Sequence, residues 1–286
     1  MRTLRFVVGL SLLVMTLAVA IGNVAVATRE PPSSPSAQVQ RLVEKLASSS
    51  ADERKEAREG LLALGAAAVP SLILATESNN ATLRWEAVNL LGALRDLHAT
   101  DAVLHVAISD PDVHARWRAN WAITCLDDGT VVPRLIAALD GEDPTTAWNA
   151  AITLSLFGRP EAVPLLHQGL LAEGWRRWEA VNALGRVWND ETVSRLISVL
   201  KEGVEDVRKE AALSLGRIGG DAALLALIEA LAHDPSPEVR WRAAMMIGRI
   251  GEEGSVPLLV TLRAKEAHPL VILRIDEAIE ALTPSP

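Results

Sequence analysis

The residues of this sequence that could do catalytic or metal chemistry are few and scattered. The chain of 286 residues has one cysteine, Cys125, and six histidines. A single cysteine excludes an internal disulfide framework and a four-thiolate zinc site. The histidines never form the H-x-x-x-H or H-E-x-x-H spacing of helical metal sites, and neither a glycine-rich phosphate loop nor a G-x-S-x-G elbow occurs. We therefore expect no catalytic residue, no metal and no cofactor, and a protein that is not an enzyme.

Tryptophan is the one unusual residue type that recurs at a fixed place. The chain has eight Trp but two Phe and no Tyr, and five of the Trp occupy the second position of a repeated segment. A tryptophan that a partner buries can contribute about 2 kcal/mol or more to binding. The candidate binding residues for a protein or peptide partner are Trp85, Trp117, Trp121, Trp148, Trp178 and Trp241. The alternative is structural, with each indole covering a small residue of the next repeat.

An arginine opens the same segment in seven of its eight copies, beside the predicted apolar stripe. We expect these guanidinium groups to hydrogen-bond turn carbonyls or an acid of an adjacent unit, and so to hold the repeats together. The structural ladder consists of Arg54, Arg84, Arg116, Arg177, Arg208, Arg240 and Arg274.

These residues are positioned by a repeat of thirty to thirty-four residues. Segments such as RWEAVNLLG from Arg84 and RKEAALSLG from Arg208 align without gaps, and Val-Pro pairs open a second apolar stretch in most copies. Proline fits the first turn of a helix, and Asp110-Pro111, Asp143-Pro144 and Asp234-Pro235 are predicted to begin second helices. Residues 37–283 are therefore predicted to form about eight helical hairpins, an all-α solenoid, with a short tail at 284–286.

The N-terminus has the pattern of an export signal or a membrane anchor. Arg2 and Arg5 precede an uncharged run, and Ala25-Val26-Ala27 offers small residues for a signal peptidase. The run from Phe6 to Ala27 is also long enough to cross a bilayer. We predict that residues 1–27 are a signal peptide or an anchor and that residues 28–36 are a Pro/Ser-rich tether. The body is then exported to the periplasm or cell envelope, either secreted or held at the membrane through an uncleaved segment.

The charge of the chain limits its partners. The formal net charge is −8, whereas a protein that grips nucleic acid through its phosphates needs a basic face. We therefore expect no nucleic-acid partner.

The repeat resembles a known family. The pattern V-P-L-L followed by D-x-x-V-R-x-x-A-A-x-x-L-G-x-I-G is similar to the HEAT repeat, in the short form named after the phycobilisome lyases. The nearest matches run from Glu205 to Gly219 and from Glu238 to Gly251. The resemblance covers about 250 residues and implies a curved HEAT-like superhelix, but such repeats serve many functions. Deoxyhypusine hydroxylases are also helical-repeat proteins, and the absence of any His-Glu pair argues against that activity.

Three hypotheses for function follow. The first is a non-enzymatic scaffold of the cell envelope that binds a protein or peptide on its concave face. The second, implied by the resemblance, is a lyase- or isomerase-like protein that acts on a bilin-type chromophore. The third is a structural spacer that associates with itself.

Overall fold

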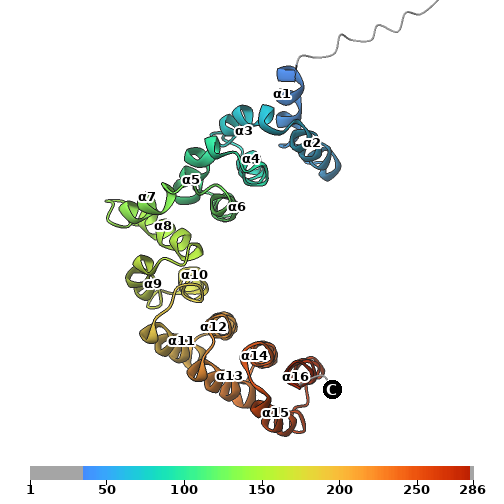
Figure 1. Ribbon diagram of the computed structural model, residues 1–286, viewed down its shortest axis with the longest axis vertical. Coiled ribbons are helices and arrows are strands. Elements are labelled where there is room, and N and C mark those ends of the chain that lie inside the picture. The colour runs from blue at the N-terminus through green and yellow to red at the C-terminus, as the bar shows by residue number, and fades with distance from the viewer. Residues whose placement is uncertain (1–34, 284–286) are drawn as a thin grey trace, which may run out of the picture.

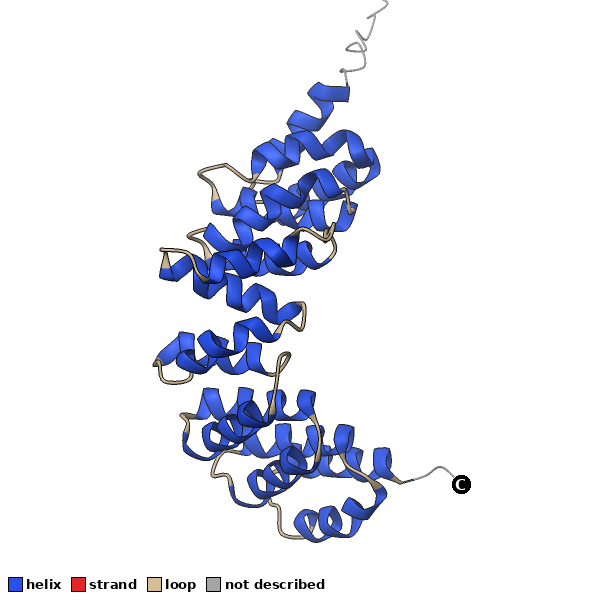
Figure 2. Ribbon diagram, turned by 60° about the vertical axis from the view of Figure 1, so that its left-hand side comes forward, coloured by secondary structure: helices blue, strands red, loops and turns tan. Residues whose placement is uncertain are grey.

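The computed structural model describes residues 35–283, and all regular structure within that range is helical. Figure 2 shows the helices joined by short loops in an elongated stack. Eight hairpins follow one another, as the repeat predicts. The predicted signal or anchor at 1–27, most of the tether at 28–36 and the tail at 284–286 lie outside the described residues.

The hairpins form two rows that curve into an open crescent (Figure 1). The first helices of the hairpins form the outer row: α1 (Pro35–Lys45), α3 (Val69–Ala75), α5 (Thr100–Ser109), α7 (Val131–Leu139), α9 (Val163–Gly169), α11 (Asp190–Glu202), α13 (Asp221–His233) and α15 (Val256–Arg263). The second helices form the inner row, which faces the concave side: α2 (Ala51–Leu64), α4 (Ala81–Leu94), α6 (Val113–Thr124), α8 (Pro144–Leu156), α10 (Gly174–Leu184), α12 (Glu205–Ile218), α14 (Pro237–Ile250) and α16 (Pro269–Leu282).

A continuous apolar core runs between the two rows. In the first seven copies of the repeated segment the fourth residue is alanine and the eighth is a larger aliphatic residue, and the two face the core one helical turn apart. Ala87 and Leu91 of α4 are fully buried, as are Ala243 and Ile247 of α14. A single hairpin cannot bury its apolar stripe, so the stripe is buried only where neighbouring hairpins stack.

Glycine sets how closely neighbouring inner helices approach. A Cβ atom on Gly92 of α4 would lie 2.6 Å from the Cβ of Ala122 on α6, and one on Gly248 of α14 would lie 2.9 Å from the Cα of Ala278 on α16. These pairs of helices pack closely along their lengths. In α6 and α8 the same place is taken by Thr124 and Ser155, which are larger than glycine.

The inner row is interrupted at α8. Helix α6 barely contacts α8, and α8 packs instead against α5 of the outer row. Buried polar groups hold α8 in this set-back position. Asn149 donates to the carbonyl of Ile108 at 2.9 Å, and the hydroxyl of Thr153 donates to Asn120 Oδ1 at 2.7 Å. In Figure 1, α8 lies farther from the concave opening than α6 does.

Two predicted helix starts are shifted. Asp143 caps α8 as predicted, but α6 begins after Asp112 and α14 after Ser236. Asp110 and Asp234 therefore lie in the turns before these helices, where their carboxylates bind arginine.

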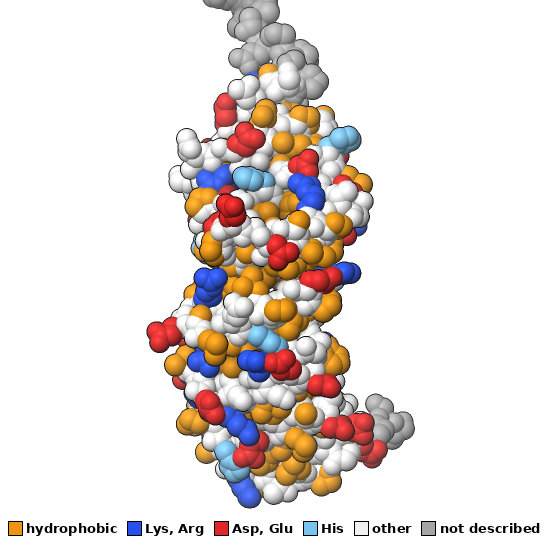
Figure 3. Space-filling model, turned by 90° about the vertical axis from the view of Figure 1, so that its left-hand side faces the viewer, with side chains coloured by type: hydrophobic (Ala, Val, Ile, Leu, Met, Phe, Trp, Pro, Cys, Tyr) orange, Lys and Arg blue, Asp and Glu red, His pale blue; other side chains and the backbone are white. Residues whose placement is uncertain are grey.

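The outer face of the crescent has a mixed surface. Figure 3 shows acidic, basic and apolar side chains interspersed over this face.

Within the described residues, the stretch Ala51–Ala75 is long and apolar enough to cross a membrane by composition. It comprises α2, the 3-10 helix Gly65–Ala68 and α3, and Gly65 has a φ of 58°, so the stretch is a bent pair of helices in the first repeats.

Candidate functional site

Three tryptophans from two inner helices meet on the concave side. Trp175 and Trp178 of α10 stack with ring centroids 4.6 Å apart and an interplanar angle of 17°. Trp117 of α6 lies 6.2 Å from Trp175 and 6.3 Å from Trp178. Because α8 is set back, a residue of α6 reaches α10 across the intervening repeat. Trp117 and Trp175 are each 52% exposed, so the cluster presents apolar ring faces to solvent.

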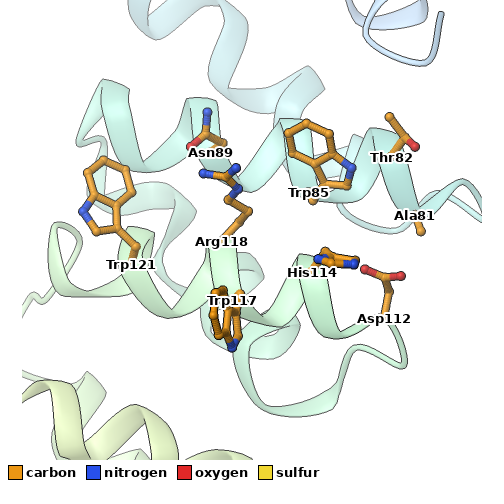
Figure 4. A pocket seen from close by; sticks show the side chains of 9 residues that line it. All are labelled: Ala81, Thr82, Trp85, Asn89, Asp112, His114, Trp117, Arg118 and Trp121. Carbon is orange, nitrogen blue, oxygen red and sulfur yellow. The ribbon is translucent and has the colours of Figure 1, made fainter. Parts of the chain in front are cut away.

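A cavity of about 860 Å³ lies between α4 and α6, beside this cluster. Trp85, Trp117 and Trp121 line it, and Figure 4 shows the side chain of Arg118 between Trp85 and Trp121. The guanidinium of Arg118 lies 5.6 Å from the centre of the Trp85 ring, which is a cation–π distance. In the same view the ring of His114 lies between Trp85 and the carboxylate of Asp112.

A second cavity of about 490 Å³ occupies the space that α8 leaves open. Trp117 and Trp121 line both cavities, so the two adjoin, and Trp178 and Arg186 lie on the far side. Its floor includes Thr124, Ile152 and Ser155. This second cavity therefore opens where glycine is missing from the packing position. We call the two adjoining cavities the aromatic groove, lined by Trp85, Trp117, Trp121, Trp178, Arg118 and Arg186.

The six candidate tryptophans do not share one environment. Trp117 and Trp121 are exposed, and Trp85 and Trp178 are half-buried at the edge of the groove. Trp148 is buried, donates to Glu179 at 3.1 Å, and covers Gly169 of the next repeat. Trp241 is half-buried far along the stack, where Arg242 lies 4.2 Å from its ring centre. The structure thus brings four of the six together in the groove.

Three arginines of the ladder make paired hydrogen bonds with an acid of the following repeat. Arg84 donates to Asp110 at 2.7 and 2.8 Å, and Arg208 donates to Asp234 at 2.8 and 2.9 Å. Arg240 donates to Glu266 at 2.7 and 3.0 Å. In each pair the acid lies twenty-six residues after the arginine. The remaining Nη1 donates to a carbonyl of the preceding turn, such as Ser78 for Arg84 at 2.9 Å.

The other four ladder arginines lack such an acid. Arg116 donates only to turn carbonyls, at 2.8 and 3.2 Å, and the buried Nε of Arg177 has no hydrogen-bond partner. Arg54 lies 3.8 Å from the buried Glu86. Arg274 pairs within its own helix with Glu277 at 2.6 Å. Two of the incomplete positions, Arg116 and Arg177, lie on the helices that flank the groove.

Burial and arginine act in opposite directions on the acids of these contacts. The hydrogen bond from Arg240 lowers the pKa of Glu266. Burial alone would raise the pKa of Asp110, but its bonds from Arg84 and the Asp112 backbone outweigh burial and lower it. Burial raises the pKa of Glu86, even though Arg58 lies 2.7 Å away. The carboxylates of Asp110 and Glu266 are thus stabilised in the charged form, whereas that of Glu86 is not.

Several groove residues were absent from the candidates that the sequence suggested. Trp175 stands outside the repeated segment, yet it lies three residues before Trp178, which places both on one helix face. Arg118 and Arg186 occupy repeat positions that arginine also takes elsewhere, so the sequence did not single them out, and His114 stands in no repeated pattern.

The remaining titratable groups do not gather elsewhere. Among residues 35–283, no cluster of three or more His, Cys, Asp or Glu side chains could hold a metal ion. The buried His167 on the outer row bonds Thr192 Oγ1 at 3.0 Å, and burial lowers its pKa.

Comparison with known proteins identifies the repeat. HEAT repeats match residues 100–177, 172–235 and 196–282. The uncharacterized phycocyanin operon protein Z of Pseudanabaena tenuis is 30% identical over 139 residues, which span 46% of this chain and 68% of that protein.

Solved structures of the same architecture include proteins of different activity. The YibA protein of Escherichia coli has a TM-score of 0.51 and 19% identity, over 84% of this chain and 91% of its own. The complex of CpcE and CpcF of phycocyanin lyase from Nostoc has a TM-score of 0.47 and 23% identity, over 90% and 97%. Human deoxyhypusine hydroxylase has a TM-score of 0.38 and 22% identity, over 87% and 96%.

These comparisons correct one expectation and leave another without support. The expectation that the chain is not an enzyme is wrong, because phycocyanin lyase and deoxyhypusine hydroxylase are enzymes among its structural neighbours. The lack of a recognised catalytic motif is therefore no ground for excluding an activity. None of the relatives supports a scaffold of the cell envelope. The chain belongs to the HEAT repeat family, in the form related to phycocyanin operon proteins.

Proposed function

We propose that the aromatic groove binds a bilin-type chromophore and that the protein acts on this chromophore as a lyase or an isomerase. The observation that carries the proposal is the cluster of Trp117, Trp175 and Trp178, whose ring faces lie exposed beside two adjoining cavities. Flat conjugated ligands bind well against such faces, because offset stacking adds to the burial of apolar area. The kinship with a phycocyanin operon protein supports this class of ligand.

The dimensions and openness of the groove suit an extended ligand. Ligand cavities generally measure about 300–1,000 Å³, and each of the two cavities falls within that range. Since they adjoin at Trp117 and Trp121, a long ligand can occupy both. The open concave side also leaves room for a protein that delivers or receives the chromophore.

His114 is the residue that we assign to proton transfer in this reaction. It lines the larger cavity next to Trp85, and histidine is the side chain that most often transfers protons in catalysis. Asp112 is less suited to the task, because its carboxylate accepts from the backbone of Ala115 at 2.9 Å as the cap of α6.

Titration of the purified full chain with biliverdin tests the binding. We expect induced visible circular dichroism and quenched tryptophan fluorescence. Trp117→Ala should weaken the affinity by at least about tenfold, the usual effect of a central aromatic anchor. Trp188→Ala is the matched control, because Trp188 is 56% exposed but does not line the groove. An unchanged chromophore spectrum, or equal losses in the two variants, would rule the proposal out.

A second experiment separates binding from reaction. A bilin-carrying protein is mixed with the chain, and the release or isomerisation of its chromophore is followed by absorbance. His114→Gln should slow this change while leaving biliverdin affinity within about twofold, because the imidazole supplies a proton and not the stacking surface. Equal rates for His114→Gln and the native chain would remove His114 from the mechanism.

We also propose that residues 1–27 direct export of the repeat body. The positive start and the long uncharged run support this location. Mass spectrometry of the N-terminus and fractionation of cells test it. A body found in the cytoplasm with Met1 intact would overturn the proposal, whereas cleavage before Thr28 or recovery in the envelope agrees with it.

A further inference from the structure

The aromatic groove contains two guanidinium groups that pair with no acid, although the chain as a whole is acidic. Within residues 35–283, neither Arg118 nor Arg186 has a carboxylate oxygen within ion-pair distance. Arg118 stacks over Trp85, and Arg186 donates to the carbonyl and side-chain oxygens of Asn182 at 2.8 and 2.5 Å. Arg84, Arg208 and Arg240 on the same row of helices are paired with acids, whereas Arg116 and Arg177 beside the groove form no ion pair either.

The acids near the groove are already engaged. Asp112 caps α6, and Glu179 accepts from the indole of Trp148 at 3.1 Å. Glu210 accepts from Asn182 at 2.7 Å and from Arg217 at 3.1 Å. None of these carboxylates lies within ion-pair distance of Arg118 or Arg186.

The surroundings of Arg186 favour an incoming anion. Burial and the neighbouring Arg217 lower its pKa more than Glu210 raises it, so the charged form is less well stabilised than in water. A carboxylate placed against this guanidinium would offset both effects.

The two arginines lie in different cavities of the groove. Arg118 lines the larger cavity and Arg186 the smaller, whereas Trp117 and Trp121 line both. We propose that the groove recognises a flat, conjugated ligand that carries two carboxylates, one bound by Arg118 and the other by Arg186, with the indoles of Trp117 and Trp121 against the conjugated system between them. This inference rests on the proposed function in using the same groove, and it adds the charge and the shape of the ligand.

A pair of ligands that differ only in charge tests the inference. Biliverdin carries two free carboxylates, and its dimethyl ester carries none. The full chain should bind biliverdin more tightly than the ester, by about tenfold for each charge-assisted contact. The preference should shrink as salt is added, because exposed charges are screened.

Substitution of each arginine assigns the two contacts. Arg118→Gln and Arg186→Gln should each weaken biliverdin about tenfold and leave the ester within about twofold. Arg195→Gln is the control, because Arg195 lies on the outer row and pairs with Glu191 at 2.6 Å. Circular dichroism and thermal unfolding of the variants should match those of the native chain, since both groove arginines are exposed.

The outcomes distinguish this inference from the function on which it rests. Equal affinity for biliverdin and its ester would overturn the recognition of carboxylates and leave chromophore binding intact. Failure of both ligands to bind would overturn the proposed function and this inference together. A loss for the ester as large as that for biliverdin in the arginine variants would show that the arginines support the groove and do not bind the ligand's charge.

Discussion

The C-terminal repeats and the central repeats use the same hairpin in different ways. In α12, α14 and α16 the inner helices pack closely, with Gly216 against Met246 and Gly248 against Ala278. In α6 and α8 the packing position holds Thr124 and Ser155, and these helices separate to form the smaller cavity of the aromatic groove. The same architecture therefore yields a tightly packed stack where the repeat is kept and a binding surface where it is broken.

The ladder shows the same division. Arg208 and Arg240 each bind an acid of the next repeat with two hydrogen bonds. Beside the groove, Arg116 binds only carbonyls, and the Nε of Arg177 is buried without a partner. Arg84 of α4 makes the same contact with Asp110, so the missing contacts are those of the repeats of Arg116 and Arg177, and we expect the C-terminal region to be more stable than these repeats.

The largest effect is expected from filling the close contact in the C-terminal region. Gly248→Val would drive a side chain into the backbone of Ala278 and should cost about 3 kcal/mol in the free energy of unfolding. Thr124→Val, at the equivalent position beside the groove, should cost less than about 1 kcal/mol because Thr124 is exposed. Urea denaturation measures both, and similar losses would contradict the proposed difference in packing.

Breaking the ladder should have the next largest effect. Arg240→Ala leaves Glu266 without its partner in a mostly buried site, which should cost about 2–3 kcal/mol. Arg177→Ala should cost less, because Arg177 pairs with no acid. If the two variants unfold at the same urea concentration, the acid of the ladder contributes nothing to stability.

Acid should change the contributions of Glu266 and Glu86 to stability in opposite directions. The pKa of Glu266 is lowered in the folded chain, so the stability that it provides is present above the ordinary carboxyl value of 4.5 and is lost as the pH falls through the lower folded value. The pKa of Glu86 is raised, so its contribution becomes more favourable as the pH falls through that higher value.

Glutamine variants measure these opposite contributions. Glu266→Gln should destabilise the chain at pH 7 and have less effect at pH 3, whereas Glu86→Gln should be better tolerated at pH 7 than Glu266→Gln. The free energy of unfolding across this pH range is the measurement, and parallel profiles for the two variants would refute the contrast.

The smallest effect on stability is expected from filling the groove itself. Thr124→Trp places a large side chain on an exposed floor position and should change stability by about 0.5 kcal/mol or less. It should nevertheless weaken biliverdin binding, since it occupies the cavity. A variant with normal stability and undiminished affinity would show that the ligand lies elsewhere.

Much of the architecture could be predicted because its causes are local and repeated. The period of the Arg-x-x-Ala segments predicted helical hairpins, and the eight hairpins of the described residues confirm it. Helix starts were less predictable, since an aspartate before proline can cap a helix or bind an arginine. Asp143 does the first, and Asp110 and Asp234 do the second.

The groove was only partly predictable. The tryptophans at the second position of the repeated segment indicated an aromatic surface. That position alone did not distinguish the buried Trp148 from the exposed Trp117. Arg118, Arg186 and His114 come from α6 and from the end of α10, and they share the groove because α8 is set back.

The amino-acid order by itself determined the hairpins, the acidic charge and the positions of the tryptophans, because helix periodicity and capping act over a few residues. Which tryptophans are exposed, which arginines find an acid and where the inner row opens were decided only by the tertiary structure. Those properties depend on the distances between helices, which are set by side-chain volumes and buried hydrogen bonds from repeats about thirty or sixty residues apart.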